Sequence, residues 1–243
     1  MIVKQAKDYI VFPLDVPTFK RARSFVQKLE GNVGTFKVGL ELFIASGPDV
    51  IHMIRQESNA KIFLDLKLHD ISATVQRATA RAASLGVDLI TVHCASSKNI
   101  LEKAVKGSKG KTGVLGVTLL TDNDAGVVEN CRFKEAYVCA PDILVMKRAQ
   151  MAFDSGCTGV VCSGREVRAI KEKFGDSFLA VTPGIRPSWA VLEKDDQKRV
   201  ATPAGAVKDG SDLIVIGRPI RDAKDPVRAA QNVIEEIAAV LTG

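Results

Sequence analysis

The strongest constraint on the fold is an alternation that runs along the whole chain. Short runs rich in β-branched residues are separated by longer stretches whose apolar residues recur at the spacing of an amphipathic helix. Residues 17–30 illustrate the helical pattern, because Ala22, Val26 and Leu29 would lie on one face. The short runs predict eight strands, at residues 9–14, 35–38, 61–66, 89–92, 113–117, 159–161, 178–181 and 213–216.

Helices are predicted between and after these strands, at residues 17–30, 41–57, 72–85, 98–106, 140–155, 164–173, 203–209 and 226–241. Eight βα units in 243 residues predict an α/β fold, a single (β/α)8 TIM barrel that occupies residues 1–243 as one domain. The alternative is a doubly wound open sheet, which usually carries a glycine-rich loop after its first strand. Here that strand ends in Leu14-Asp15-Val16-Pro17, with no glycine, and this favours the barrel.

The composition excludes several classes of protein. With 46% hydrophobic and 26% charged residues, the chain is globular rather than disordered. The net charge of +6 would suit an anionic partner, but aromatic residues make up only 5% and the basic residues are scattered, which argues against nucleic-acid binding. The five cysteines contain no C-x-x-C pair, and no stretch resembles a signal peptide or a membrane span. We therefore expect a cytoplasmic protein with no nucleic-acid or membrane partner.

Charged side chains gather where the predicted strands end, which is where TIM-barrel active sites lie. Asp15 follows the first strand, Lys37 lies on the second, and the third leads into Asp65-Leu-Lys-Leu-His-Asp70. Residues two apart in a strand point the same way, so Asp65 and Lys67 should both face the barrel mouth. Buried charges are costly unless they are paired. We interpret the group as a functional network, with a structural ion-pair layer as the alternative.

The carboxyl end of the last strand offers an anion site. Gly217 allows close approach of the backbone, and Arg218 provides bidentate hydrogen bonds, so the pair predicts a phosphate site. A turn with a solvated arginine is the alternative. The long segment at residues 182–199 is predicted to be a lid that carries Arg186 and Gln197. No grouping of His, Asp and Glu has the spacing of metal ligands, so we predict no metal site.

Several stretches, taken in order along the chain, resemble one known family. They are Leu14-Asp15, Phe36-Lys-Val-Gly39, Phe63-Leu-Asp-Leu-Lys-Leu-His-Asp-Ile71, Thr91-Val-His93, Thr182-Pro-Gly-Ile-Arg186, Asp196-Gln-Lys-Arg199 and Val215-Ile-Gly-Arg218. Together they resemble the orotidine 5′-monophosphate decarboxylase family, in its short bacterial form. The resemblance implies a cofactor-independent carboxy-lyase that converts orotidine 5′-monophosphate to uridine 5′-monophosphate in pyrimidine biosynthesis.

The resemblance also implies a role for each candidate residue. Lys67 would be the proton donor, with Asp65, Asp70 and Lys37 completing a charged tetrad. The family forms its sites at a homodimer interface, so Asp70, Ile71 and Thr74 would reach the neighbouring subunit's site. The remaining substrate contacts would be Asp15 and Lys37 at the ribose, Thr121 at the pyrimidine, and Gln197, Gly217, Arg218 and Arg186 at the phosphate.

Two other functions stay open at this point. The D-x-K-x-x-D pattern occurs in a wider superfamily that includes metal-dependent sugar-phosphate decarboxylases. An enzyme of that kind, or an epimerase on the same barrel, would use Asp65 as a magnesium ligand. A non-catalytic phosphate-binding protein would keep Gly217 and Arg218, but it would gain little from a cluster of four charges.

Overall fold

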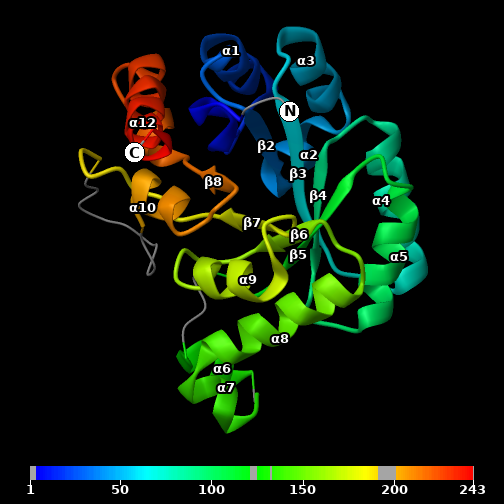
Figure 1. Cartoon of the computed structure of the whole chain (residues 1–243). Coiled ribbons are helices and arrows are strands. Elements are labelled where there is room, and N and C mark those ends of the chain that lie inside the picture. The colour runs from blue at the N-terminus through cyan, green and yellow to red at the C-terminus, as the bar shows by residue number, and fades with distance from the viewer. Residues whose placement is uncertain (1–3, 121–124, 132, 191–200, 243) are drawn as a thin grey trace.

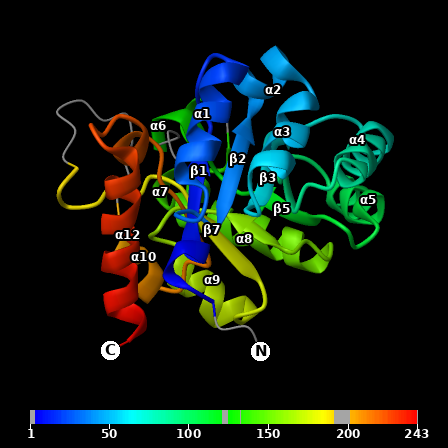
Figure 2. The ribbon, with the colours of Figure 1, turned by 90° about the horizontal axis from the view of Figure 1, so that it is seen from above.

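A computed structural model describes residues 4–120, 125–131, 133–190 and 201–242 of the chain. Eight parallel strands of these residues close into a barrel in which each strand pairs with the next and β8 pairs with β1. The strands occupy the centre of Figure 1, and the helices surround them. Figure 2, turned by 90°, shows α12 and the α4–α5 pair on opposite sides of the strands. The predicted TIM barrel is therefore confirmed, whereas its extent as one domain over residues 1–243 stays a prediction.

All eight predicted strands are found, and their ends differ from the predicted ends by no more than two residues. They are β1 (Ile10–Pro13), β2 (Thr35–Gly39), β3 (Lys61–Leu68), β4 (Leu89–His93), β5 (Gly113–Val117), β6 (Gly159–Val161), β7 (Leu179–Thr182) and β8 (Leu213–Val215).

In the described residues, one 3-10 helix precedes β1 and the other helices follow the strands along the chain. They are the 3-10 helix η1 (Ala6–Tyr9), α1 (Phe19–Leu29), α2 (Leu40–Ser46), α3 (Asp49–Glu57), α4 (Ser72–Ser84), α5 (Lys98–Ser108), α6 (Ala125–Asn130), α7 (Glu135–Cys139), α8 (Pro141–Asp154), α9 (Val167–Phe174), α10 (Pro203–Lys208), α11 (Arg218–Arg221) and α12 (Pro226–Leu241). In this part of the chain, no helix combines the length and the hydropathy that a membrane crossing needs.

The single helix predicted at residues 41–57 is wrong. The structure has α2 and α3 there, separated by Gly47 and Pro48. Gly47 takes a φ of 55°, a conformation that glycine adopts without strain, and it ends α2. Pro48 has no N–H to continue a helical ladder, so it stands at the start of α3 instead.

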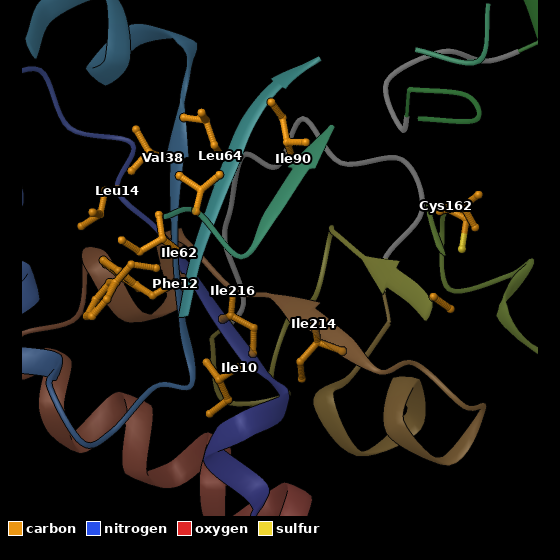
Figure 3. Close-up of a cluster of buried hydrophobic side chains, with 14 of the residues drawn as sticks. Ile10, Phe12, Leu14, Val38, Ile62, Leu64, Ile90, Cys162, Ile214 and Ile216 are labelled. Atoms are coloured by element: carbon orange, nitrogen blue, oxygen red, sulfur yellow. The ribbon is translucent and has the colours of Figure 1, made fainter. Parts of the chain in front are cut away.

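The strands are buried on both faces, and successive residues alternate between them. Even-numbered positions of β1, β3 and β8 pack outward against the helices; for example, the Phe12 ring lies 5.4 Å from the Phe25 ring of α1. Figure 3 shows part of this outer layer, including Ile10, Phe12, Ile62, Leu64, Ile214 and Ile216. Odd-numbered positions fill the barrel interior with Val11, Phe63, Leu89, Leu115, Val181 and Leu213. The next odd positions along the strands are therefore the ones that reach the barrel mouth.

Candidate active site

A cavity of about 430 Å³ opens at the carboxyl ends of the strands. Its floor is apolar, with Phe63, Val117, Val161, Val181 and Val215 continuing the interior layer. The next inward-facing positions along the strands also line the cavity, since Asp65 lies two residues beyond Phe63 and Gly217 two residues beyond Val215. The charged side chains that line the cavity are Asp15, Lys37, Asp65, Lys67, Arg186, Arg218 and Arg221.

Four of these side chains form an alternating row of charges. The Lys67 Nζ lies 2.8 Å from Asp65 Oδ2, and the Lys37 Nζ lies 3.3 Å from the same oxygen. Lys37 also contacts Asp15 Oδ1 at 3.3 Å. The side chains of Asp65 and Lys37 are only 10% and 12% exposed, so these contacts are poorly screened by solvent. The network was predicted for Asp15, Lys37, Asp65, Lys67 and Asp70, and the structure brings the first four of these side chains together within one chain.

The environment of Asp65 keeps its carboxylate ionised. Burial alone would raise the pKa of this group, but the charges of Lys37 and Lys67 and the hydrogen bonds from Lys67 and Thr91 outweigh it. The pKa of Asp65 is consequently held below its ordinary value. The ionised carboxylate in turn fixes the Lys67 ammonium beside the cavity.

Lys67 reaches the cavity by an irregular backbone rather than by the regular strand expected from the sequence. Leu64 pairs with Ile90 and Leu68 with Val92, so residues 65–67 of β3 lie opposite the single residue Thr91 of β4. This bulge places Lys67 at a φ of 48°, in the left-handed region. The expectation that Asp65 and Lys67 share one face is confirmed, but simple strand alternation is the wrong reason for it.

Thr91 is a site residue that the roles inferred from the sequence omit. Its hydroxyl accepts a hydrogen bond from the Lys67 backbone N–H at 2.8 Å and donates one to Asp65 Oδ1 at 2.9 Å. The available signal was its inward-facing position on the fourth strand, two residues before His93. Arg221 was also missed: it lines the cavity and donates to the backbone carbonyl of Asp15 at 3.0 Å.

The cavity end formed by β7 and β8 is cationic. Gly217 precedes α11, and Arg218 is the first residue of that helix rather than part of a simple turn. A Cβ on Gly217 would lie 2.9 Å from Pro13 Cγ, so only glycine lets β8 approach β1 this closely. Arg186 and Arg218 both line the cavity here. Thr121, Gln197 and half of the predicted lid, residues 191–199 of 182–199, lie outside the described residues.

Asp70, Ile71 and Thr74 do not join the cavity of their own chain. Asp70 is exposed, and its carboxylate accepts a hydrogen bond from the Ile71 N–H at 2.6 Å. Within the described residues it forms no ion pair. Ile71, just before α4, is 70% exposed, an unusual position for a large apolar side chain. Thr74, in the first turn of α4, accepts a hydrogen bond from Arg77.

The contacts of the two Asp65 oxygens bear on whether this residue binds a magnesium ion, as the metal-dependent sugar-phosphate enzymes would require. Both of its oxygens are already used, Oδ1 by the Thr91 hydroxyl and Oδ2 by the two ammonium groups. Among the described residues there is also no group of three or more His, Cys, Asp or Glu side chains that could hold a metal ion. The cavity therefore resembles an ion-paired site more than a metal centre, and the absence of a cofactor stays a prediction.

Comparisons with known proteins agree with this geometry. Residues 8–233 match the family described as "Orotidine 5'-phosphate decarboxylase / HUMPS family". A relative from Desulfosudis oleivorans, named orotidine 5'-phosphate decarboxylase, is 48% identical over 236 residues, which are 97% of this chain and 95% of the relative. A relative of the same name from Geobacter metallireducens is 42% identical over 241 residues, covering 97% of this chain and 98% of its own.

A solved structure gives the same result for the fold. The orotidine 5'-phosphate decarboxylase from Lactobacillus acidophilus is 35% identical, with a TM-score of 0.81 over 94% of this chain and 98% of that chain. The resemblance inferred from the motifs is confirmed, and the chain belongs to the orotidine 5'-phosphate decarboxylase / HUMPS family.

Proposed function

We propose that this chain decarboxylates orotidine 5′-monophosphate to uridine 5′-monophosphate without a metal or other cofactor. The observation that carries the proposal is the row of paired charges around Lys67 and Asp65, in a cavity whose opposite end is lined by Arg186 and Arg218. The relatives from D. oleivorans and G. metallireducens carry the name of this activity.

The reaction leaves a negative charge on C6 of the pyrimidine ring that is difficult to stabilise. When the bond between C6 and the carboxylate breaks, carbon dioxide leaves and the bonding electron pair stays on C6, with no adjacent π system to delocalise it. The Lys67 ammonium is a preorganised cation that stabilises this charge. It then donates its proton to C6, which completes the product and leaves a neutral amine that solvent reprotonates. The ion pair with Asp65, at 2.8 Å, holds the Lys67 ammonium in place.

The remaining contacts bind the rest of the nucleotide. Arg218, Gly217 and Arg186 hold the phosphate, and Gln197 assists from the lid. Asp15 and Lys37 contact the ribose, and Thr121 contacts the pyrimidine. The guanidinium groups of Arg186 and Arg218 support this orientation, because arginine matches the geometry of phosphate oxygens. Binding energy from the remote phosphate is thereby available to organise the reacting end.

The active sites are shared across a homodimer, in which Asp70, Ile71 and Thr74 complete the site of the neighbouring subunit. Two features support this part of the proposal. The Lys67 side chain is 32% exposed, so part of it is accessible from outside its own chain. Asp70 and Ile71 are both exposed on the connection between β3 and α4, where they can project from their own barrel. The cytoplasmic location stays a prediction.

The alternatives explain less of the geometry. A magnesium ion on Asp65 would have to displace Lys37, Lys67 or Thr91 from its oxygens. A protein that only binds phosphate would not need two half-buried lysines around one carboxylate, since burying such charges is costly.

One assay separates the proposed function from both alternatives. The purified chain is mixed with orotidine 5′-monophosphate, and the absorbance of the substrate is followed with and without EDTA. Turnover that resists the chelator is the expected result. Turnover that EDTA abolishes would show that the reaction needs a metal ion, and binding of the nucleotide without turnover would favour a sugar-phosphate enzyme or a phosphate-binding protein.

A further inference from the structure

We infer that Thr91 is a positioning residue, whose hydroxyl ties the backbone of Lys67 to the carboxylate of Asp65. The inference rests on the proposed function, because it assigns Thr91 a part in orienting the proton donor. It concerns a residue that contacts neither end of the nucleotide in the proposal above. Thr91 would act through Lys67 and Asp65 alone.

The two hydrogen bonds of Thr91 have a fixed direction. The hydroxyl oxygen lies 2.8 Å from the Lys67 backbone nitrogen and 2.9 Å from Asp65 Oδ1. A backbone N–H can only donate and an ionised carboxylate can only accept, so the single proton of the hydroxyl points at Asp65. Thr91 is fully buried, and no solvent competes for either bond. The hydroxyl is thus a defined link between the two residues.

The first bond stabilises an unfavourable backbone. Lys67 has a φ of 48°, which residues with a Cβ rarely adopt. The bulge opposite Thr91 removes the Lys67 N–H from the regular pairing between β3 and β4. A buried N–H without a partner is costly, and the threonine hydroxyl supplies the partner that the strand ladder lacks. This backbone conformation directs the Lys67 side chain to the cavity.

The second hydrogen bond gives the two oxygens of Asp65 different partners. With Oδ1 held by Thr91, Oδ2 is left to accept from both Lys37 and Lys67. His93 of β4 is a further titratable side chain near Asp65. Its own pKa is lowered, chiefly by burial. Without the hydroxyl the carboxylate would be free to rotate away from the two ammonium groups. The hydrogen bond from Thr91 is also among the contacts that lower the pKa of Asp65.

Strand β2 provides a matched control. Thr35 of β2 is also a buried threonine on an inward-facing strand position, 1% exposed. Its hydroxyl is the one buried side-chain nitrogen or oxygen among the described residues that has no hydrogen-bond partner. The change Thr35→Val therefore removes a hydroxyl at equal burial without removing a hydrogen bond.

The experiment compares Thr91→Val, Thr91→Ser and Thr35→Val by steady-state kinetics with orotidine 5′-monophosphate. In Thr91→Val we expect kcat to fall at least about tenfold, the equivalent of ~1.4 kcal/mol of barrier. KM should change much less, because the phosphate contacts are untouched. Thr91→Ser, which keeps the hydroxyl, should recover most of kcat, and Thr35→Val should resemble the wild type. An unchanged kcat in Thr91→Val would overturn the inference, and so would an equal loss in Thr91→Ser.

A second measurement does not depend on activity. The carboxyl carbon of Asp65 is titrated by NMR in the free proteins, where Thr91→Val should show a higher Asp65 pKa than the wild type and Thr91→Ser should not. If the wild type lacks decarboxylase activity, the proposed function fails, while this titration still decides whether Thr91 holds Asp65. An identical Asp65 titration in Thr91→Val and wild type would refute the link. Should Thr91→Val fold poorly, Thr91→Ala and Thr91→Ser make the same comparison, since they differ by one hydroxyl.

Discussion

Mixing two inactive variants tests whether each active site is built from two subunits. Lys67 lines the cavity of its own chain, whereas Asp70 lies outside it on the exposed connection to α4. If Asp70 acts in the neighbouring subunit, Lys67→Ala and Asp70→Ala homodimers should each lose nearly all turnover, because every site in them lacks one of the two groups. Each variant then retains the group that the other lacks, so a mixed dimer can bring Lys67 and Asp70 together in one site.

The size of the recovery follows from the two-fold symmetry of a dimer. In a mixed dimer, one site combines Lys67 of the Asp70→Ala chain with Asp70 of the Lys67→Ala chain and is complete. The other site carries both changes. Random exchange between equal amounts makes half of the dimers mixed, so about a quarter of all sites should regain activity.

The assay is the loss of substrate absorbance after the two variants are incubated together, with subunit exchange followed separately by native mass spectrometry. A mixture of Lys67→Ala with Asp65→Ala is the control, because Asp65 and Lys67 line the same cavity of one chain and neither site of a mixed dimer would be complete. Subunits that exchange without any return of activity would show that Asp70 acts within its own chain.

Three further predictions follow from the charged groups. Arg218→Ala should lower kcat/KM at least about tenfold, because a charge-assisted hydrogen bond contributes roughly 1.5–3 kcal/mol. Lys171→Met should lower the free energy of unfolding by about 3 kcal/mol, measured with urea, since its 2.6 Å ion pair with Asp212 is only 11% and 22% exposed. Asp65→Asn should be less stable than the wild type at pH 7, and the difference should shrink below a pH of about 4, because the lowered pKa of Asp65 contributes stability only while its carboxylate is ionised.

Each of these predictions has a direct check. For Arg218→Ala the unphosphorylated nucleoside is the control substrate, and an equal loss on both substrates would place Arg218 outside the phosphate site. For Lys171→Met the matched change is Arg228→Met, whose ion pair with Glu235 is 59% and 62% exposed and should contribute less than about 1 kcal/mol. Similar losses in both variants would contradict the role of burial. A stability difference for Asp65→Asn that does not vary with pH would contradict its lowered pKa.

Local patterns in the sequence predicted much of the fold. Strand runs such as residues 61–66 alternate with amphipathic segments, and α1 shows why this works: Thr18 caps its first turn, while Ala22, Phe25, Val26 and Leu29 form the buried face. Period-two alternation also explains why Asp65 follows Phe63 into the barrel interior. The break between α2 and α3 was missed although its signal, Gly47-Pro48, is local.

In the candidate site, too, the sequence predicts one part and only the tertiary structure reveals the other. Residue types and their order along the chain were enough to predict the ion-paired row and to suggest the family, because each charged residue lies on a recognisable strand or just after one. They did not reveal the bulge in β3, the left-handed Lys67 or the hydroxyl that joins Lys67 to Asp65. Thr91 is 24 residues from Lys67 and 26 from Asp65 along the chain. Its two hydrogen bonds exist only once β3 and β4 pair in one register, and that register is set by packing across the whole barrel.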